Sequence, residues 1–157
     1  MIQVAACMKR NVVSVSRSST VLEAVRTVIA RHVGTLPVVD EAGVLLGLTT
    51  VQDLIKLFLP DFVTLIDDFE FVHDFGAVEL QRLENQPEIA AKSIAEIMSP
   101  PVSVEMNARL LRTMSLMQKH DVRDMPVVDN EGRLVGIASH VDLASAFFQL
   151  WIGEGTG

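Results

Sequence analysis

Two short motifs place a hydroxyl three residues before a carboxylate: Thr50 precedes Asp53, and Ser139 precedes Asp142. Each motif fits a capping box, in which the hydroxyl and the acid satisfy free backbone N–H groups at a helix start. The same groups fit ligand chemistry, because a helix N-terminus attracts phosphate and a hydroxyl can donate to a phosphate or sugar oxygen. An acid one turn further on can accept from two ribose hydroxyls. Both interpretations predict a helix that begins at each motif.

Other constellations give weaker indications of chemistry. Glu70 and His73, with Asp67 and Asp74 nearby, resemble half of a di-iron carboxylate site, but the sequence has no second Glu-x-x-His motif. A solvated acidic helix face is the better interpretation. The single cysteine, Cys7, has no evident base partner, and no nucleophile elbow, Cys-x-x-Cys pair or P-loop occurs. We therefore expect neither a metal site nor an enzyme.

The two hydroxyl–acid motifs belong to a longer internal repeat. Shifting the sequence by 89 positions aligns residues 13–59 with residues 102–148 without a gap. The Pro-Val-Val-Asp segment at residues 37–40 recurs at residues 126–129, and the glycines that follow it recur as well. The matches fall on turn glycines, a proline, an acid and apolar positions, which indicates a duplicated structural unit rather than shared composition.

Each copy predicts the same order of elements, β-α-β-β-α, over about 50 residues. In the first copy these are a β-rich segment at 12–15, a helix opened by the capping box of Thr20 and Glu23, strands at 36–39 and 44–48, and a helix from 51 to about 59. The second copy begins with a β-rich segment at 102–104, and Asn107 is its predicted helix cap. One such unit buries little core, so the two units are expected to pack together through their sheets.

The segment between the copies does not repeat. Apolar spacing predicts an amphipathic helix from about residue 61 towards residue 75, a second helical stretch over residues 77–85, and a capping box at Ser93 and Glu96. The predicted organisation is a first unit at 1–60, a helical insert at 61–97, a second unit at 98–151 and a flexible tail at 152–157.

Composition narrows the function classes. The sequence is 49% hydrophobic and 21% charged, which excludes general disorder and suggests apolar surface left for a partner. The net charge of −7 disfavours binding to nucleic acid or anionic lipid. No apolar run of about 18 residues occurs, so we expect no membrane span. A signal peptide is not expected, and the single cysteine favours a cytoplasmic protein.

An ordered set of short motifs carries a family resemblance. A methionine shortly before Val-Ser-Val is followed by Pro-Val-Val-Asp-x-x-Gly and then by Leu-x-Gly, a hydrophobic residue, one variable residue and Thr/Ser-x-x-Asp. This set resembles the CBS domain, and its two copies resemble a CBS pair, also called a Bateman module. The resemblance implies an α+β fold whose two units pack about a pseudo-two-fold axis and form two clefts. It also implies that the clefts bind adenosine compounds such as AMP, ADP, ATP, S-adenosylmethionine or sometimes NAD.

The resemblance assigns ligand-binding roles to positions near these motifs. The candidates are Val13, Ser14, Leu36, Pro37, Thr50, Asp53, Val102, Ser103, Arg123, Met125, Pro126, Ser139, His140 and Asp142. The acids would hold ribose, the hydroxyls and basic side chains would hold phosphate, and the apolar positions would surround adenine or form core. The first copy has Gly34 and Val51 where the second has Arg123 and His140. We therefore expect the helix terminus at Asp142 to be the tighter anchor.

The functional hypothesis is a non-catalytic, ligand-sensing regulatory module. It would require no cofactor, bind an adenine nucleotide, and signal to a separate, unidentified protein partner through a population shift. The resemblance also implies a homodimer, with contacts expected near residues 54–59 and 143–151. The alternative is a ligand-free interaction or scaffold protein that works through its helical insert and dimer surface.

Overall fold

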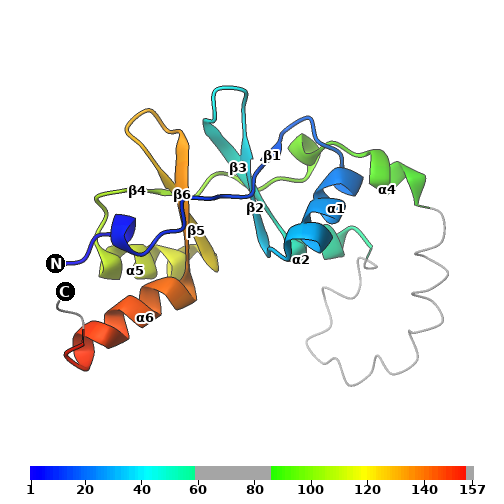
Figure 1. Ribbon diagram of the computed structural model, residues 1–157. Coiled ribbons are helices and arrows are strands. Elements are labelled where there is room, and N and C mark those ends of the chain that lie inside the picture. Colours follow the sequence, from blue (N-terminus) through cyan, green and yellow to red (C-terminus); the bar gives the residue numbers. More distant parts are fainter. Residues whose placement is uncertain (59–85, 155–157) are drawn as a thin grey trace, which may run out of the picture.

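The computed structural model describes residues 1–58 and 86–154, which form two units of the same topology (Figure 1). Unit one comprises β1 (Val15–Ser16), α1 (Val21–Arg31), β2 (Thr35–Val39), β3 (Leu45–Thr50) and α2 (Val51–Lys56). Unit two comprises β4 (Val104–Glu105), α5 (Leu110–His120), β5 (Asp124–Val128), β6 (Leu134–Ser139) and α6 (His140–Trp151). The predicted α+β class and the order β-α-β-β-α are confirmed in both copies.

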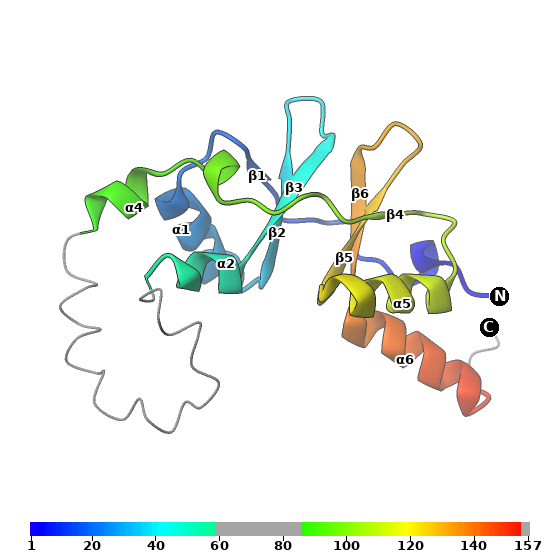
Figure 2. The same ribbon diagram turned by 180° about the vertical axis from the view of Figure 1, so that it is seen from behind.

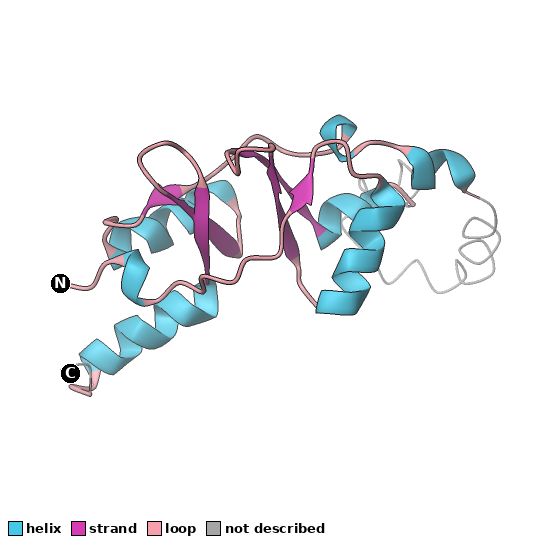
Figure 3. Ribbon diagram, turned by 45° about the horizontal axis from the view of Figure 1, so that its top comes forward, coloured by secondary structure: helices cyan, strands magenta, loops and turns pink. Residues whose placement is uncertain are grey.

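Each unit contains a three-stranded sheet with the same pairing. In unit one β1 runs parallel to β2, and β2 pairs antiparallel with β3; β4, β5 and β6 repeat this arrangement. The β2–β3 and β5–β6 hairpins turn at Gly43 and Gly132, whose positive φ angles of 83° and 78° favour glycine. In Figure 3 the strands of both units lie between the helices of unit one and those of unit two.

The two hairpins meet along a pseudo-two-fold axis. The backbone N–H of Leu45 donates to the carbonyl of Gly132 at 3.0 Å, and that of Leu134 donates to the carbonyl of Gly43 at 2.9 Å. These bonds join positions exchanged by the 89-residue repeat, as expected when symmetry relates the two units. Leu45 and Leu48 of unit one also pack with Val128 of unit two, so the two sheets share a small core.

Capping differs between the two long equivalent helices. Thr20 and Glu23 form the predicted capping box of α1: the Thr20 N–H donates to Glu23 Oε2 at 2.8 Å, and the Glu23 N–H donates to Thr20 Oγ1 at 3.2 Å. The predicted cap of α5 at Asn107 is wrong, because the helix begins later, with Arg109 at the N-cap and no side-chain cap. The first N–H of α5, that of Leu110, instead donates to the carbonyl of Ile2 at 3.2 Å.

A segment before each unit packs on the other unit. We call residues 1–9 the N-terminal strap and residues 93–99 the insert strap. Figures 1 and 2 show the N-terminal strap starting beside unit two and crossing to β1, and the insert strap running from unit one to β4. Val4, in a 3-10 helix (Val4–Ala6), is fully buried in the core of unit two; Ile94, in a matching 3-10 helix (Ile94–Glu96), is fully buried in the core of unit one.

The described part of the insert is short. α4 (Pro87–Ala91) packs against α1, and Ser93 and Glu96 form the predicted capping box. The helices predicted over residues 61–85 lie outside the described residues, as do Glu70 and His73. Within residues 1–58 and 86–154, no helix is long and apolar enough to span a bilayer.

Candidate functional site

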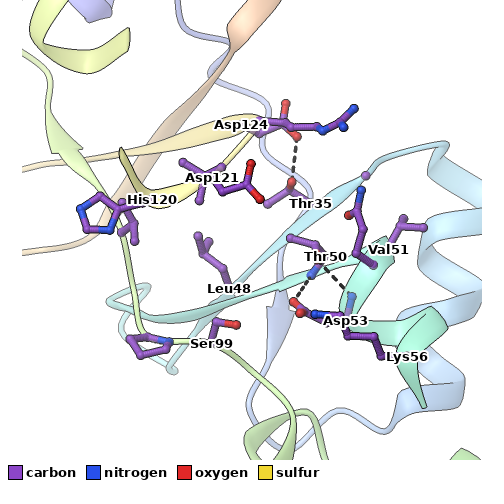
Figure 4. Close-up of a pocket in the computed structure, with 16 residues that line it drawn as sticks. Thr35, Leu48, Thr50, Val51, Asp53, Lys56, Ser99, His120, Asp121 and Asp124 are labelled. Atoms are coloured by element: carbon purple, nitrogen blue, oxygen red, sulfur yellow. Dashed lines mark hydrogen bonds between the residues drawn. The ribbon is translucent and has the colours of Figure 1, made fainter. Parts of the chain in front are cut away.

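The larger cleft between the units has a volume of about 740 Å³ and is walled by both of them (Figure 4). This lies within the range of about 300–1,000 Å³ that is usual for small-molecule sites. Unit one contributes the start of β2, the end of β3 and helix α2, whereas unit two contributes residues 120–124 at the α5–β5 connection. Ser99, Pro100 and Val102 line the cleft from the segment that leads into β4. We call this cavity the Asp53 cleft.

Thr50 and Asp53 lie on the wall formed by β3 and α2, where they form the predicted capping box. The Thr50 N–H donates to Asp53 Oδ2 at 2.9 Å, and the Asp53 N–H donates to Thr50 Oγ1 at 3.2 Å. Both residues are partly exposed and line the cavity. Asp53 Oδ1 accepts no hydrogen bond from the residues that the structure describes. Capping therefore occupies one carboxylate oxygen and leaves the second available to a ligand.

Charged side chains of both signs surround the Asp53 cleft. Lys56 lies one turn beyond Asp53 on α2, and Arg123 enters from unit two. Neither of these cations forms an ion pair within the described parts of the chain. Asp121 and Asp124 lie on the opposite wall (Figure 4). The cleft can thus pair two cations with phosphate and keep an acid for hydroxyl groups.

A smaller cleft of about 240 Å³ lies on the other side of the pseudo-two-fold axis. Lys9, Val13 and His32 line it, and the two cavities share Thr35 and Asp124 as a common wall. Thr35 is almost fully buried, and its hydroxyl donates to Asp124 Oδ2 at 2.7 Å. This hydrogen bond joins two equivalent positions of the repeat and separates the clefts.

Ser139 and Asp142 form the same capping box at the start of α6, but they do not line the smaller cleft. Lys9 Nζ lies 3.8 Å from Asp142 Oδ2. Partial burial raises the pKa of Asp142, but hydrogen bonds from Ser139 and the positive charge of Lys9 outweigh it, so this pKa lies below its usual value. Burial, with a smaller effect of the Asp142 charge, raises the pKa of Cys7 and so disfavours its thiolate.

The structure separates the predicted site residues into several environments. Thr50, Asp53, Val102 and Arg123 line the larger cleft, whereas Val13 lines the smaller one. The apolar candidates in the middle strands are buried in the interior and line neither cleft: Leu36, Pro37, Met125 and Pro126. Ser14 is exposed, Ser103 lines a separate surface cavity beside β4, and His140 lies with its Nδ1 3.3 Å from the carbonyl oxygen of Arg123.

Arg123 lies in a different place from the one that the sequence comparison favoured. It was expected to strengthen the site at Asp142, but it lines the cavity of Asp53. Sequence reasoning also missed Lys56, Ser99 and Asp124 as lining residues. Because the larger cleft takes its helix start from unit one and its opposite wall from unit two, alignment of the two copies alone could not combine these residues.

A comparison with family models matches the CBS domain at residues 4–60 and again at residues 94–149. The chain belongs to the CBS domain family. A CBS domain-containing protein of Dictyostelium discoideum is 27% identical over 137 residues, which cover 87% of this chain and 84% of that protein. The chain spans a smaller share of several other relatives, including 14% of an L-aspartate semialdehyde sulfurtransferase of Methanocaldococcus jannaschii and 61% of the chloroplastic CBSX2 of Arabidopsis thaliana.

Solved CBS pairs share this fold. CBSX2 from Arabidopsis thaliana, in a crystal structure with AMP, superposes with a TM-score of 0.71 at 26% identity, over 96% of this chain and 99% of that chain. The CBS pair of protein MJ0100, solved with 5′-methylthioadenosine and S-adenosyl-L-methionine, gives a TM-score of 0.67 at 23% identity, over 93% and 99% of the two chains. The predicted tandem CBS pair is thereby confirmed.

Proposed function

We propose that the CBS pair senses an adenosine-containing ligand, such as AMP, ADP, ATP or S-adenosylmethionine, in the Asp53 cleft. The observation that carries the proposal is the position of Asp53 in a cavity of about 740 Å³, with Oδ2 engaged by the helix cap and Oδ1 available. Asp53 would accept from the ribose hydroxyls. Arg123 and Lys56 would pair with phosphate, and the aliphatic wall near Val102 would contact the base.

The similarity to CBSX2 supports this choice of ligand class. That protein was crystallised with AMP and shares the fold across almost the whole chain. The cleft residues of the present chain fit such a ligand in type, because they offer an acid for ribose, two cations for phosphate and apolar groups for a base. AMP is therefore the first ligand to test.

Two matched variants test the role of Asp53. Asp53→Ala and Asp142→Ala each remove the acid of a capping box at the start of a helix, but only Asp53 lines the larger cleft. Loss of a charged hydrogen-bond partner costs about 1.5–3 kcal/mol, which weakens binding roughly ten- to a hundredfold. Isothermal titration calorimetry with AMP should show this loss for Asp53→Ala and little change for Asp142→Ala. Equal affinity of Asp53→Ala and the unchanged protein would refute the ribose contact.

Arg123→Ala separates phosphate recognition from base and ribose recognition. Arg123 offers only a cation, so its removal should weaken AMP binding and leave adenosine binding unchanged. Calorimetry with both compounds measures the difference. A parallel loss for AMP and adenosine would show that Arg123 supports the cleft itself rather than contacting phosphate.

We further propose that the pair acts without catalysis and passes ligand binding to a separate protein. Ligand bound in the cleft touches both units, so it would favour one relative arrangement of the units over another. Hydrogen exchange with and without AMP tests this step. Protection is expected in α2 and in the α5–β5 connection together, and protection confined to one unit would contradict it.

We also propose a homodimer formed through α6. This helix exposes several large apolar side chains towards its end: Phe148 at 56%, Leu150 at 44% and Trp151 at 79% exposure. Such a patch is costly to leave in water, and a second copy could cover it. Sedimentation at tens of micromolar should show a dimer that the double substitution Phe148→Ser with Trp151→Ser dissociates. A monomer under the same conditions would refute the dimer.

A ligand-free scaffold is the second candidate, since the same apolar surface of α6 could bind a different protein. A thermal shift distinguishes the two functions. A ligand at 100 times its Kd stabilises the fold by about 2.7 kcal/mol, whereas a scaffold with empty clefts gains nothing from adenosine compounds.

A further inference from the structure

The two straps occupy equivalent places on the two units, although the 89-residue repeat does not align them. The backbone of Lys9 pairs with Ile137 on β6, and the backbone of Ser99 pairs with Leu48 on β3. Leu48 and Ile137 are equivalent residues of the repeat, so Lys9 and Ser99 are structural counterparts. A shift of 90 positions therefore aligns the two straps, whereas a shift of 89 positions aligns the two units. The difference arises because the second copy has one residue fewer between its strap and its Val-Ser-Val segment.

Both straps are held firmly where they cross the clefts. The Lys9 N–H donates to the carbonyl of Ile137 at 2.8 Å, and the Ile137 N–H donates back to the carbonyl of Lys9 at 2.9 Å. Ser99 and Leu48 make the same pair of bonds at 2.8 and 3.0 Å. The methionine before each of these strap residues lies against the glycine before the paired strand residue: Met8 lies against Gly136, and Met98 lies against Gly47. The residue at the Lys9 or Ser99 position is therefore presented at a fixed place beside its cleft.

The two counterparts differ in what they do to the neighbouring helix start. Ser99 is short, lines the larger cleft and makes no side-chain bond to Asp53, so Thr50 and Asp53 face the cavity. Lys9 reaches Asp142, with Nζ 3.8 Å from Oδ2. On that side the cavity is about 240 Å³ rather than about 740 Å³, and Asp142 is no longer part of its lining.

We propose that Lys9 closes the second cleft of this CBS pair by placing its side chain over the carboxylate of Asp142, so that the chain binds one adenosine compound, at Asp53. The strap residue is a specificity-determining position in each cleft: serine leaves the ribose-binding acid accessible, and lysine covers it. This inference rests on the proposed function and adds which of two related clefts is filled and which residue decides it.

The size of the effect follows from two contributions. Lys9 is largely exposed, so its ion pair with Asp142 alone gives a factor of only a few in ligand affinity. A ligand must also displace the aliphatic stem of Lys9 from space that it would itself occupy. Together these contributions should change the affinity of the second cleft about tenfold or more.

Exchange of the two counterparts provides a reciprocal test. Lys9→Ser should open the cleft at Asp142, and Ser99→Lys should cover Asp53. Calorimetry with AMP should give one site per chain for the unchanged protein, two for Lys9→Ser, and none in the same concentration range for Ser99→Lys. The double variant should again bind one AMP, and this site should now be abolished by Asp142→Ala and kept in Asp53→Ala.

A second measurement tests the Lys9–Asp142 contact without ligand. Carbon NMR titration of the Asp142 carboxyl should give a higher pKa in Lys9→Ser than in the unchanged protein. Two equivalent AMP sites in the unchanged protein, one site in Lys9→Ser, or tighter binding in Ser99→Lys would each overturn the inference while leaving the proposed function intact. Failure of all variants to bind AMP, adenosine or S-adenosylmethionine would overturn the proposed function itself, whatever the titration shows.

Discussion

The contact between Gly47 and the insert strap allows a sharp prediction about stability. A methyl group added at Gly47 would lie 2.7 Å from the backbone oxygen of Ser99 and 2.9 Å from Met98 Sδ. Real Cβ atoms essentially never approach other atoms within 3.0 Å. The methionine can rotate away, but the carbonyl belongs to a strap held by two backbone hydrogen bonds to Leu48. Gly47→Ala must therefore displace the strap.

The energetic cost combines overpacking and lost hydrogen bonds. Inserting a methyl group into a packed site costs about 1–3 kcal/mol, and each backbone hydrogen bond that lengthens or breaks contributes about 0.5–1.5 kcal/mol. We expect Gly47→Ala to lower the free energy of unfolding by about 2–3 kcal/mol. Gly136→Ala should cost less, because its closest contact is the flexible side chain of Met8 and the backbone oxygen of Lys9 is further away, at 3.2 Å.

Equilibrium unfolding in urea measures these differences, and Gly34→Ala is the matched control. Gly34 lines the Asp53 cleft, but a methyl group added there meets no atom within 4 Å and its φ is not positive. It should change the stability by no more than about 0.5 kcal/mol. If Gly47→Ala is as stable as Gly34→Ala, the insert strap is not held against β3, and Ser99 has no fixed position beside the Asp53 cleft.

Three further predictions concern caps, the insert and acid stability. Thr20→Ala should cost about 1 kcal/mol of stability because it removes a formed capping box, whereas Asn107→Ala should be nearly neutral; thermal melts would show the contrast, and equal effects would contradict it. Replacing residues 59–85 by a short flexible linker should keep a cooperative melt, because the strands and helices described for both units lie outside this segment, and aggregation would contradict this. The lowered pKa of Asp142 means that its ionised carboxylate stabilises the fold above about pH 4, and that this stability is lost as the pH falls through the pKa of Asp142 in the folded protein. Lys9→Ser should therefore make the free energy of unfolding fall less steeply at acid pH. An unchanged pH dependence would refute the ion pair.

Local features of the fold could be predicted because they depend on neighbours in sequence. The capping boxes at Thr20, Thr50, Ser93 and Ser139 need only a hydroxyl and an acid three residues apart, and all four form. The cap at Asn107 failed for a non-local reason. The first free N–H of α5 is satisfied by the carbonyl of Ile2, which belongs to a strap far away in sequence.

The composition of the clefts could not be derived from either copy alone. Arg123 directly precedes β5 of unit two but lines the cavity that contains Asp53 of unit one. The sequence identified both residues as candidates and grouped Arg123 with Asp142, whereas in the structure Arg123 lines the cavity of Asp53. Only the crossing of the two units about their axis determines which helix start faces which connection, and a repeat alignment contains no information about that crossing.

Some of the positions where the two copies differ lie at the clefts. The repeat keeps its paired glycines, prolines and core aliphatic residues, which the symmetric packing of the two sheets requires. At the shared wall Thr35 corresponds to Asp124, so a single hydrogen bond of 2.7 Å crosses the axis instead of two like groups facing each other. Next to it Gly34 corresponds to Arg123, which places the cation on one side of the axis alone. An exactly duplicated chain would bind two ligands equally, whereas the function proposed above places the phosphate and ribose contacts in the cleft that holds Asp53.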